Sequence, residues 1–317
     1  PAAVDDDAGA VDEDGAIAGI DVVANDDDPD SDGQLFVARV AGVAISVGGT
    51  VTLASGAQVT LAPDGTLTWS AAGAFQSLAE GEAAVESFAY TVEDQDGLQD
   101  EALVTLTVEG ANDAPDARDD QLFTSESAAI SGSLFVDHGA GADADPDAGD
   151  VLSVVAIDGE PADVGRPLAL AGGGVLTVTA DGGFSFDPAG DFEDLGVGQT
   201  RTVEIAYTIS DGHGGTDTAT ARFRISGVND APIAMDDAFE TGIDASVTGS
   251  VLADNGAGPD ADVDGDALSV TALNGDGGAL GAPTTLASGA LLTLNADGTF
   301  AYDPNGAFNH LGPDDAA

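Results

Sequence analysis

The sequence predicts an all-β fold made of tandem β-sandwich domains, and three observations support this. Sequence motifs recur at a spacing of 117 residues, between Asp26 and Asp143 and again between Asp143 and Asp260. A repeat of this length corresponds to a whole domain. Short segments alternate apolar and polar residues, as half-buried strands do. Glycine and aspartate separate these segments, and several short strands in a unit of about 100 residues are typical of a sandwich.

Repeated proline motifs predict where one domain ends and the next begins. The sequence Asn-Asp-Ala-Pro occurs at 112–115 and again at 229–232, and the chain starts with a matching proline, Pro1. Almost no linker separates these motifs from the preceding strands, so we expect successive domains to touch. The predicted domains are 1–113, 114–230 and 231–317.

Individual strands can be predicted from the alternation. Residues 218–225 alternate strictly, with Phe223 and Ile225 among the residues on the apolar face, and residues 104–108 do the same one repeat earlier. Such segments are typical of half-buried antiparallel strands. The best helix candidate, 75–84, is short, and we expect no more than a single helical turn there.

Asp-Gly pairs between alternating segments predict β-hairpins, because the glycine can adopt the positive φ that a tight two-residue turn requires. One such pair occurs in each repeat. The pairs are Asp64-Gly65, Asp181-Gly182 and Asp297-Gly298.

The third repeat lacks a counterpart of its last two strands. Phe308 and Leu311 match Phe192 and Leu195 of the second repeat, but nothing after Leu311 matches residues 203–225. One interpretation is that the chain is a fragment. The other is an open sandwich that accepts a strand from a neighbouring subunit.

The charge of the chain excludes several classes of function. Its 58 acidic residues face only 6 basic ones, which gives a formal net charge of −52. No basic stripe could meet nucleic acid phosphates, and an anionic membrane surface would repel the chain. No apolar run is long enough to insert into a bilayer. Hydrophobic residues nevertheless make up 43% of the chain, so it can build cores if its charge is neutralised.

Cysteine is absent, which removes disulfides and thiolate metal sites. His138, His213 and His310 occupy non-equivalent places in the repeats, and no nucleophile motif accompanies them. We therefore predict a chain that is not an enzyme and has no catalytic residues.

The acidic residues gather in three kinds of cluster that recur between repeats. Several carboxylates close together repel one another, and a hard divalent cation with six to eight oxygen ligands removes that cost. Calcium fits better than zinc, since zinc favours the histidine and cysteine that this chain scarcely has. We therefore predict Ca²⁺ as the bound ion.

The predicted ligands follow the three kinds of cluster. The loop clusters contain Asp26, Asp28, Asp30 and Asp32, then Asp143, Asp145, Asp147 and Asp150, then Asp260, Asp262, Asp264 and Asp266. The boundary clusters contain Asp5 and Asp6, then Asn112, Asp113, Asp119 and Asp120, then Asn229, Asp230, Asp236 and Asp237. The late-strand clusters contain Asp94 and Asp96, then Asp211 and Asp217.

These motifs, in this order, resemble VCBS and related cadherin-like bacterial repeats. The resemblance rests on Pro-x-Ala-x-Asp-Asp at each repeat start, the Asp-x-Asp-Pro-Asp loop, the Ala-Asp-Gly-x-Phe hairpin and the closing Asn-Asp-Ala-Pro. It covers essentially the whole chain. It implies tandem immunoglobulin/cadherin-like sandwiches with calcium at the junctions, in large type I-secreted surface proteins of Gram-negative bacteria, including RTX-type adhesins.

Three functions remain as hypotheses. The first is a non-enzymatic, calcium-stiffened extender of a secreted or cell-surface adhesin, whose partners are the neighbouring repeats of the same chain. The second is a subunit that assembles with identical subunits into an extracellular filament or surface layer, with strand exchange completing the third domain. The third, a carbohydrate-binding or hydrolytic module, lacks the aromatic insertion that would favour it.

Overall fold

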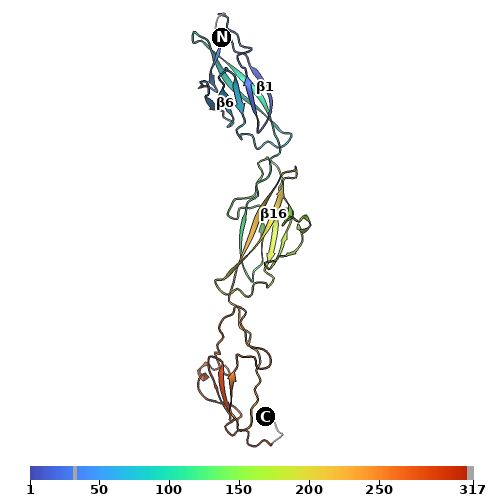
Figure 1. Cartoon of the computed structure of the whole chain (residues 1–317), viewed down its shortest axis with the longest axis vertical. Coiled ribbons are helices and arrows are strands. Elements are labelled where there is room, and N and C mark those ends of the chain that lie inside the picture. Colours follow the sequence, from blue (N-terminus) through green and yellow to red (C-terminus); the bar gives the residue numbers. More distant parts are fainter. Residues whose placement is uncertain (31–33, 313–317) are drawn as a thin grey trace.

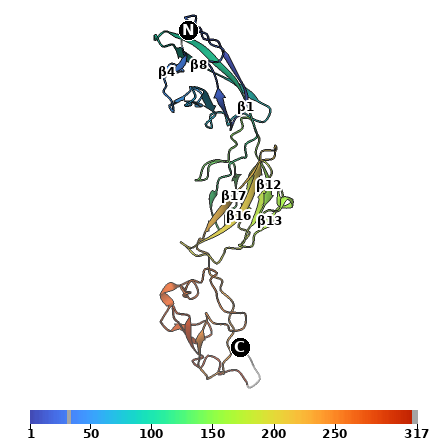
Figure 2. The same cartoon turned by 45° about the horizontal axis from the view of Figure 1, so that its top comes forward.

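The computed structural model describes residues 1–30 and 34–312, which form three β-rich units arranged end to end along an extended chain (Figure 1). The turned view in Figure 2 keeps the same succession of units. The architecture is all-β, with only two single-turn 3₁₀ segments, η1 (Pro161–Asp163) and η2 (Gly277–Ala279), among the described residues. No helix in that part of the chain has the length and apolar character needed to cross a membrane.

The first unit is a sandwich of a five-stranded and a four-stranded sheet. Its sheets have the strand orders β1-β9-β8-β3-β4 and β2-β7-β6-β5. The strands are β1 (Asp6–Asp12), β2 (Ala16–Ile20), β3 (Phe36–Val40), β4 (Val43–Ala44), β5 (Thr50–Thr52), β6 (Gln58–Leu61), β7 (Leu67–Ser70), β8 (Ala83–Glu93) and β9 (Gln99–Glu109).

The second unit repeats this plan with two four-stranded sheets, of order β10-β17-β16-β12 and β11-β15-β14-β13. The strands are β10 (Asp120–Ser125), β11 (Ile130–Ser133), β12 (Ser153–Ile157), β13 (Leu168–Ala169), β14 (Val175–Val178), β15 (Gly183–Asp187), β16 (Thr200–Ser210) and β17 (Thr216–Ser226).

Each of these two units has its own hydrophobic core, formed by the alternating residues that face between its sheets. In β17 the predicted alternation is confirmed, since Phe223 and Ile225 are fully buried while their neighbours point outward. The ring of Phe223 stacks on that of Phe186 in the opposite sheet, with centroids 4.7 Å apart. Trp69 is the only tryptophan of the chain and is fully buried in the first core, so its fluorescence reports the folding of that unit.

The structure confirms the three Asp-Gly hairpins and corrects two other expectations. The glycines Gly65, Gly182 and Gly298 all have positive φ at the tips of antiparallel hairpins. The strands predicted to be antiparallel pair in that direction with only one of their two neighbours. β17 pairs antiparallel with β16 but parallel with β10, as β9 does with β1. Residues 75–82 form turns and no helix, and β8 starts directly after them.

The third unit contains one sheet, of order β18-β21-β20-β19, among the described residues. Its buried apolar side chains there are only Ala290, Leu294 and Phe300. It therefore corresponds to half of a sandwich, as the sequence predicted. The strands are β18 (Val247–Ser250), β19 (Thr284–Thr285), β20 (Leu291–Leu294) and β21 (Thr299–Asp303).

In each complete unit, a buried tyrosine of the long hairpin forms hydrogen bonds with the segment that starts the unit. The Tyr90 hydroxyl lies 2.9 Å from the carbonyl oxygen of Val4, 3.0 Å from that of Val22 and 3.1 Å from Asp26 Oδ1, and these acceptors share its single proton. In the second unit the hydroxyl of Tyr207 lies 2.9 Å from the carbonyl oxygen of Arg118 and 3.0 Å from Asp143 Oδ2. Burial, followed by the nearby carboxylates, raises the pKa of both tyrosines far above its ordinary value.

Replacing Tyr90 by phenylalanine should destabilise the first unit by about 1–3 kcal/mol, because buried acceptors lose their donor. Urea unfolding followed by the fluorescence of Trp69 measures this loss. The control is Tyr302→Phe, because the hydroxyl of Tyr302 makes no hydrogen bond within the described chain. Equal unfolding midpoints for Tyr90→Phe and the unsubstituted chain would contradict this role.

Candidate metal centres

Three carboxylates from three separate segments converge where the first unit meets the second. Glu13 follows β1, Asp113 lies between the units, and Asp147 lies in the loop before β12. One carboxylate oxygen from each lies within 4.8 Å of the other two. Glu13 is fully buried and Asp147 is 2% exposed. These three residues are called the first bridging cluster, since they join both units.

Backbone amides hold the first bridging cluster in place. The amide of Ala111 donates to Glu13 Oε1 at 3.0 Å, and that of Asp113 donates to Asp147 Oδ2 at 2.9 Å. The chain also passes very close to the first unit here, because a side chain on Gly110 would collide with the carbonyl oxygens of Leu78 and Ala79. A glycine is therefore needed for this close exit from β9.

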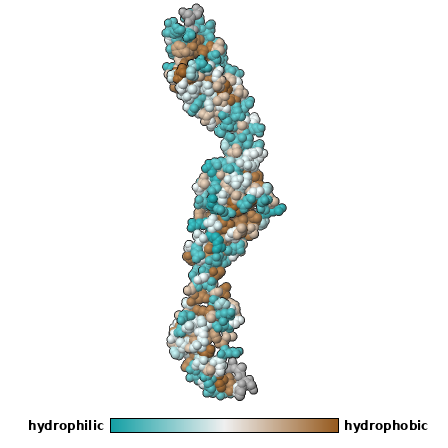
Figure 3. All heavy atoms as spheres, viewed as in Figure 1, coloured by the Kyte–Doolittle hydropathy of each residue, from teal (hydrophilic) through white to brown (hydrophobic). Residues whose placement is uncertain are grey.

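A second group of acids lies at the same junction. Oxygens of Asp145, Asp150 and Asp211 also lie within 4.8 Å of one another. The side-chain amide of Asn112 donates to Asp211 Oδ2 at 3.0 Å, and His213 Nδ1 lies 3.0 Å from Asp150 Oδ2. Figure 3 shows hydrophilic residues gathered around this narrow connection between the first two units.

Several carboxylate oxygens at this junction are buried without a hydrogen-bond partner. They are Glu13 Oε2, Asp113 Oδ2, Asp145 Oδ2 and Asp147 Oδ1. Burial, reinforced by the neighbouring carboxylates, raises the pKa values of Glu13, Asp113 and Asp145. Buried anionic oxygens without donors are costly, and a cation placed among them would remove that cost.

At the second junction, Glu126, Asp230 and Asp264 repeat the hydrogen bonds and the partnerless oxygens of the first bridging cluster, although they are not among the described groups whose oxygens all lie within 4.8 Å of one another. The amide of Val228 donates to Glu126 Oε1 at 2.6 Å, and that of Asp230 to Asp264 Oδ2 at 2.8 Å. The oxygens left without a partner are again the same three: Glu126 Oε2, Asp230 Oδ2 and Asp264 Oδ1. Burial and then Asp230 raise the pKa of Glu126. We call these residues the second bridging cluster.

Beside this cluster, oxygens of Asp262, Asp264 and Asp266 lie within 4.8 Å of one another. The side-chain amide of Asn229 donates to the carbonyl oxygen of Asp230 at 2.6 Å. In the first unit, the nitrogen of Pro1 lies 3.9 Å from carboxylate oxygens of both Asp28 and Asp94. The first loop and late-strand clusters therefore face each other across the nitrogen of Pro1.

Other predicted ligands bind the protein backbone and do not join these groups. Asp26, Asp143 and Asp260 each accept a backbone amide from the segment that starts their unit, at 2.7–2.8 Å. Asp5 and Asp119 accept the amides of Leu103 and Thr220, both at 2.9 Å.

The boundary clusters are thus divided, because Asn112 and Asp113 lie at the junction while Asp119 and Asp120 lie at the start of β10. Asp120 is 1% exposed, and burial raises its pKa to about 6. Asp6 is its counterpart in the first unit, and burial raises its pKa too.

The remaining predicted ligands also lie outside the three groups that oxygen proximity defines. Asp217 accepts the amide of Ala117 at 2.8 Å, and Asp237 accepts the side-chain amide of Asn255 at 3.0 Å. Asp30, Asp96 and Asp236 are exposed. Asp32 lies outside the described residues.

Glu13 and Glu126, which lie in the two bridging clusters, are not among the ligands predicted from the sequence. Both glutamates follow the first strand of their unit, and their amides bond the end of its last strand. The constant repeat spacing hides the match, because β1 has a register shift between Asp7 and Ala10 that β10 lacks. A search that allowed one inserted residue in the first strand would have found the pair.

The donor atoms in these clusters fit calcium. They are carboxylate oxygens from several residues, with no sulfur, and Ca²⁺ takes six to eight such oxygens in flexible geometry. Each bridging cluster draws ligands from both sides of a junction. An ion bound there would therefore fix the orientation of one unit relative to the next.

Comparison with known protein families identifies the repeats. The bacterial cadherin-like domain matches residues 1–110 and 112–227, and the bacterial Ig domain matches residues 229–316. The chain belongs to the bacterial cadherin-like domain family. This confirms the predicted kinship with cadherin-like bacterial repeats and the immunoglobulin/cadherin-like fold class.

Individual proteins similar to this cadherin-like chain include a bacterial relative and several animal cadherins. A protein of Rhizobium johnstonii named calcium-binding lectin RapA2 is 32% identical over 177 residues, which cover 53% of this chain and 70% of that protein. The human CDH23 EC21-23 structure aligns over 96% of this chain and 89% of its own, with 14% identity and a TM-score of 0.45. The human mucin-like protocadherin EC1-2 aligns over 71% and 98%, with 13% identity and a TM-score of 0.39.

Proposed function

We propose that this chain is a calcium-stiffened extender within a bacterial cell-surface or secreted adhesin, and that it has no enzymatic activity. The observation that carries the proposal is the repeated set of buried carboxylate oxygens without donors in the two bridging clusters. The same three kinds of atom lack a partner at both junctions. Calcium bound there would join each unit to the next and turn a flexible row of domains into a rod.

Two further observations support this function. The calcium-binding lectin RapA2 is similar to about half of this chain, so repeats similar to these occur in a calcium-binding protein. The net charge of −52 opposes compaction where divalent cations are scarce, which fits a chain that becomes rigid only after export. We take the domains as 1–113, 114–230 and 231–317, with the bridging clusters at their boundaries.

Glu13→Gln tests the proposal because it should destabilise the first unit in calcium but not in EDTA. In calcium, the substitution should weaken ion binding at the first junction about tenfold, since Ca²⁺ affinity depends on the number of charged ligands. In EDTA it should leave the first unit equally or more stable, because it removes a buried charge beside Asp113 and Asp147. Trp69 fluorescence during thermal unfolding, over a calcium titration, measures both effects.

Two control variants make this experiment specific. Glu101→Gln removes a charge from an exposed position on β9. It should change neither the calcium affinity of the first junction nor the stability of the first unit in EDTA. Glu126→Gln removes the equivalent ligand of the second bridging cluster and should leave the calcium response of Trp69 unchanged. If Glu13→Gln destabilised the chain equally with and without calcium, its role would be structural and the proposed ion site would be wrong.

A further inference from the structure

The first strand of each complete unit pairs in parallel with its last strand. In the first unit β1 runs beside β9, and in the second unit β10 runs beside β17. Both strands of a pair end at the exit of their unit, because the amides of Glu13 and Glu126 bond the carbonyl oxygens of Glu109 and Ser226 there. Figure 1 shows β1 and β16 lying lengthwise along the extended chain. The hydrogen bonds of each pair therefore lie across that direction.

This arrangement decides how a pulling force acts on a unit. Tension along the chain pulls the start of the first strand backward and the end of the last strand forward, so two parallel strands slide past each other. The hydrogen bonds of a parallel pair are evenly spaced along the strands, and all of them carry the load together. In an antiparallel pair of terminal strands the same force would open the bonds one by one. We call the pairs β1–β9 and β10–β17 the terminal clamps.

The terminal clamp of the second unit is continuous. Its six residue pairs run without a register shift from Asp120 and Ala221 to Ser125 and Ser226. The amide of Glu126 then bonds the carbonyl oxygen of Ser226 at 3.0 Å. For β10 to slide along β17, this whole ladder must break in one event.

Side chains add further bonds across the second clamp. Arg222 Nη1 donates to Asp119 Oδ2 at 2.8 Å, and the amide of Thr220 donates to Asp119 Oδ1 at 2.9 Å. The hydroxyl of Ser226 donates to the carbonyl oxygen of Thr124 at 3.2 Å. These contacts join β17 to β10 near both ends of the clamp.

The terminal clamp of the first unit is interrupted. A register shift between Asp7 and Ala10 places two residues, Ala8 and Gly9, opposite the single residue Leu106. This two-against-one pattern is that of a β-bulge, whose extra residue has no partner in the ladder. Gly9 has a φ of +85°, which glycine adopts readily, and its amide donates to Asp7 Oδ1 at 2.9 Å. The bulge divides the clamp into a segment of two residue pairs and a segment of three.

The first clamp also has fewer side-chain bonds. Asp5 accepts the amide of Leu103 at 2.9 Å, which matches one of the two bonds that Asp119 makes in the second clamp. Thr105 stands at the position of Arg222, and its side chain forms no hydrogen bond to β1 within the described chain. The first clamp is therefore weaker in its ladder and in its side chains.

Both terminal clamps end beside a bridging cluster. Glu13 and Glu126 belong to those clusters, and their amides extend the two ladders in the same way. An ion bound to these glutamates would support both clamps alike. The difference between the clamps does not depend on the proposed ion.

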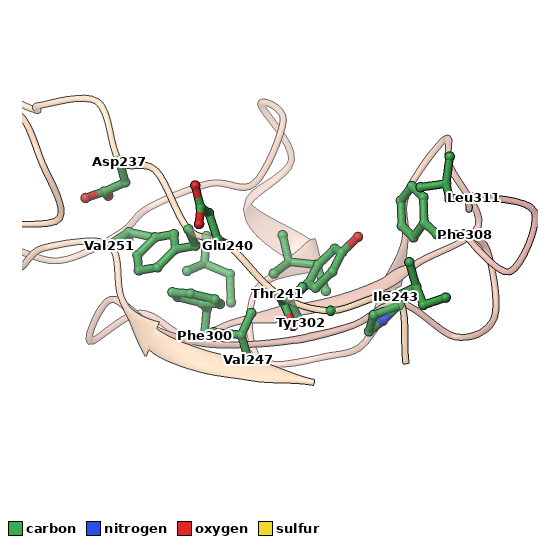
Figure 4. A pocket seen from close by; sticks show the side chains of 15 residues that line it. Asp237, Glu240, Thr241, Ile243, Val247, Val251, Phe300, Tyr302, Phe308 and Leu311 are labelled. Atoms are coloured by element: carbon green, nitrogen blue, oxygen red, sulfur yellow. The ribbon is translucent and has the colours of Figure 1, made fainter. Parts of the chain in front are cut away.

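The third unit has no terminal clamp within the described chain. Residues 237–242, which correspond to β10, form no strand there. Thr241 and Ile243 lie instead beside an open groove of about 840 Å³ that side chains of β18, β20 and β21 also line (Figure 4). Tension along the described residues therefore meets two terminal clamps, in the first and second units.

We propose that the chain bears tension and that the first unit yields to it before the second, because the bulge in β1 divides its terminal clamp. A continuous ladder has to break across six residue pairs at once, whereas the divided ladder fails in two smaller steps. The first unit thus releases its length at a force that leaves the second unit folded. This load-bearing role goes beyond stiffness.

Single-molecule force spectroscopy on the full chain, held by handles at its two ends in calcium, tests this order. A flexible insert of about 30 glycine and serine residues after Asp64, in the β6–β7 turn, marks the first unit by adding about 100 Å to the length it releases. The third unit, whose sheet spans residues 247–303, releases less than either complete unit. Forced unfolding is governed by the unfolding rate, and at constant force the first unit should unfold at least tenfold faster than the second.

One-residue changes show whether the bulge sets this order. Deletion of Gly9 closes the bulge and should slow the forced unfolding of the first unit at least tenfold. Insertion of a glycine between Phe123 and Thr124 creates a bulge in β10 and should speed that of the second unit at least tenfold. The matched control is the same insertion between Ala189 and Gly190, in an exposed turn of the second unit outside the clamp. It should leave the rate unchanged.

The outcomes separate this inference from the proposed function. Equal unfolding rates of the two complete units would overturn it, and so would a β10 insertion with no more effect than its control. The β10 insertion decides alone if the chain without Gly9 does not fold. The same order should hold in EDTA, because the bulge needs no ion. An order seen only in calcium would overturn the inference, since unequal ion sites would then set it.

Discussion

Millimolar calcium should raise the melting temperature of the first two units by well over ten degrees, and EDTA should reverse the change. An ion that binds only the folded state contributes about 2.7 kcal/mol per site at a hundred times its Kd. For domains of this size each kcal/mol corresponds to about 4–8 °C. The first junction contains two groups of carboxylates, so more than one ion can contribute there. This is a large share of a total stability that is usually about 5–15 kcal/mol.

The same experiment should show a change of shape. Small-angle scattering in calcium should give the long maximum dimension of a rod, and EDTA should give the broad distance distribution of units that bend at two hinges. Magnesium is the matched control, because it keeps part of its water shell and binds such flexible sites less completely. If neither the melting curves nor the scattering profiles changed on addition of calcium or EDTA, the proposed function would lose its basis.

The acidic loops could be predicted from the sequence because the repeat keeps them in constant register. Asp145 and Asp147 match Asp262 and Asp264 at one spacing, and all four lie in groups of converging carboxylates or in bridging clusters. The open third unit could be predicted for the same reason, since the absence of a repeated segment is visible without coordinates.

The sequence could not predict which acids lie in the junction clusters and which bind other groups of the protein. Neighbouring residues in a strand point to opposite faces, so Asp119 lies beside Arg222 on the outside while Asp120 is buried near Tyr207. Asp143 turns toward Tyr207, although it is only two residues from Asp145. The parallel pairing of β10 with β17 was also missed, because alternation in one strand does not reveal the direction of its neighbour.

The metal-free chain should lose stability as the pH rises from about 4 to about 7, the reverse of what ordinary salt-bridged carboxylates produce. Burial raises the folded-state pKa of Asp120 to about 6. Burial also raises the pKa values of Glu13, Asp113 and Glu126. A carboxyl whose pKa is higher in the folded state binds its proton more tightly there. Its contribution is therefore complete below the ordinary value of about 4 and is lost as the pH passes the folded-state value.

Calcium should reverse this dependence, because the ion binds the ionised carboxylates and competes with protons. Carboxyls whose pKa is lowered in the folded state change the stability of the chain at lower pH. Hydrogen bonds from Arg222 lower the pKa of Asp119. Burial alone would raise the pKa of Asp211, but hydrogen bonds from Asn112 and backbone amides lower it. Their contribution is lost only as the pH falls below about 4. Melting temperatures across this pH range, in EDTA and in calcium, should therefore diverge steadily toward neutral pH. A metal-free chain that grew more stable toward neutral pH would show that the buried acids are neutralised by contacts within the protein, with no need for a cation.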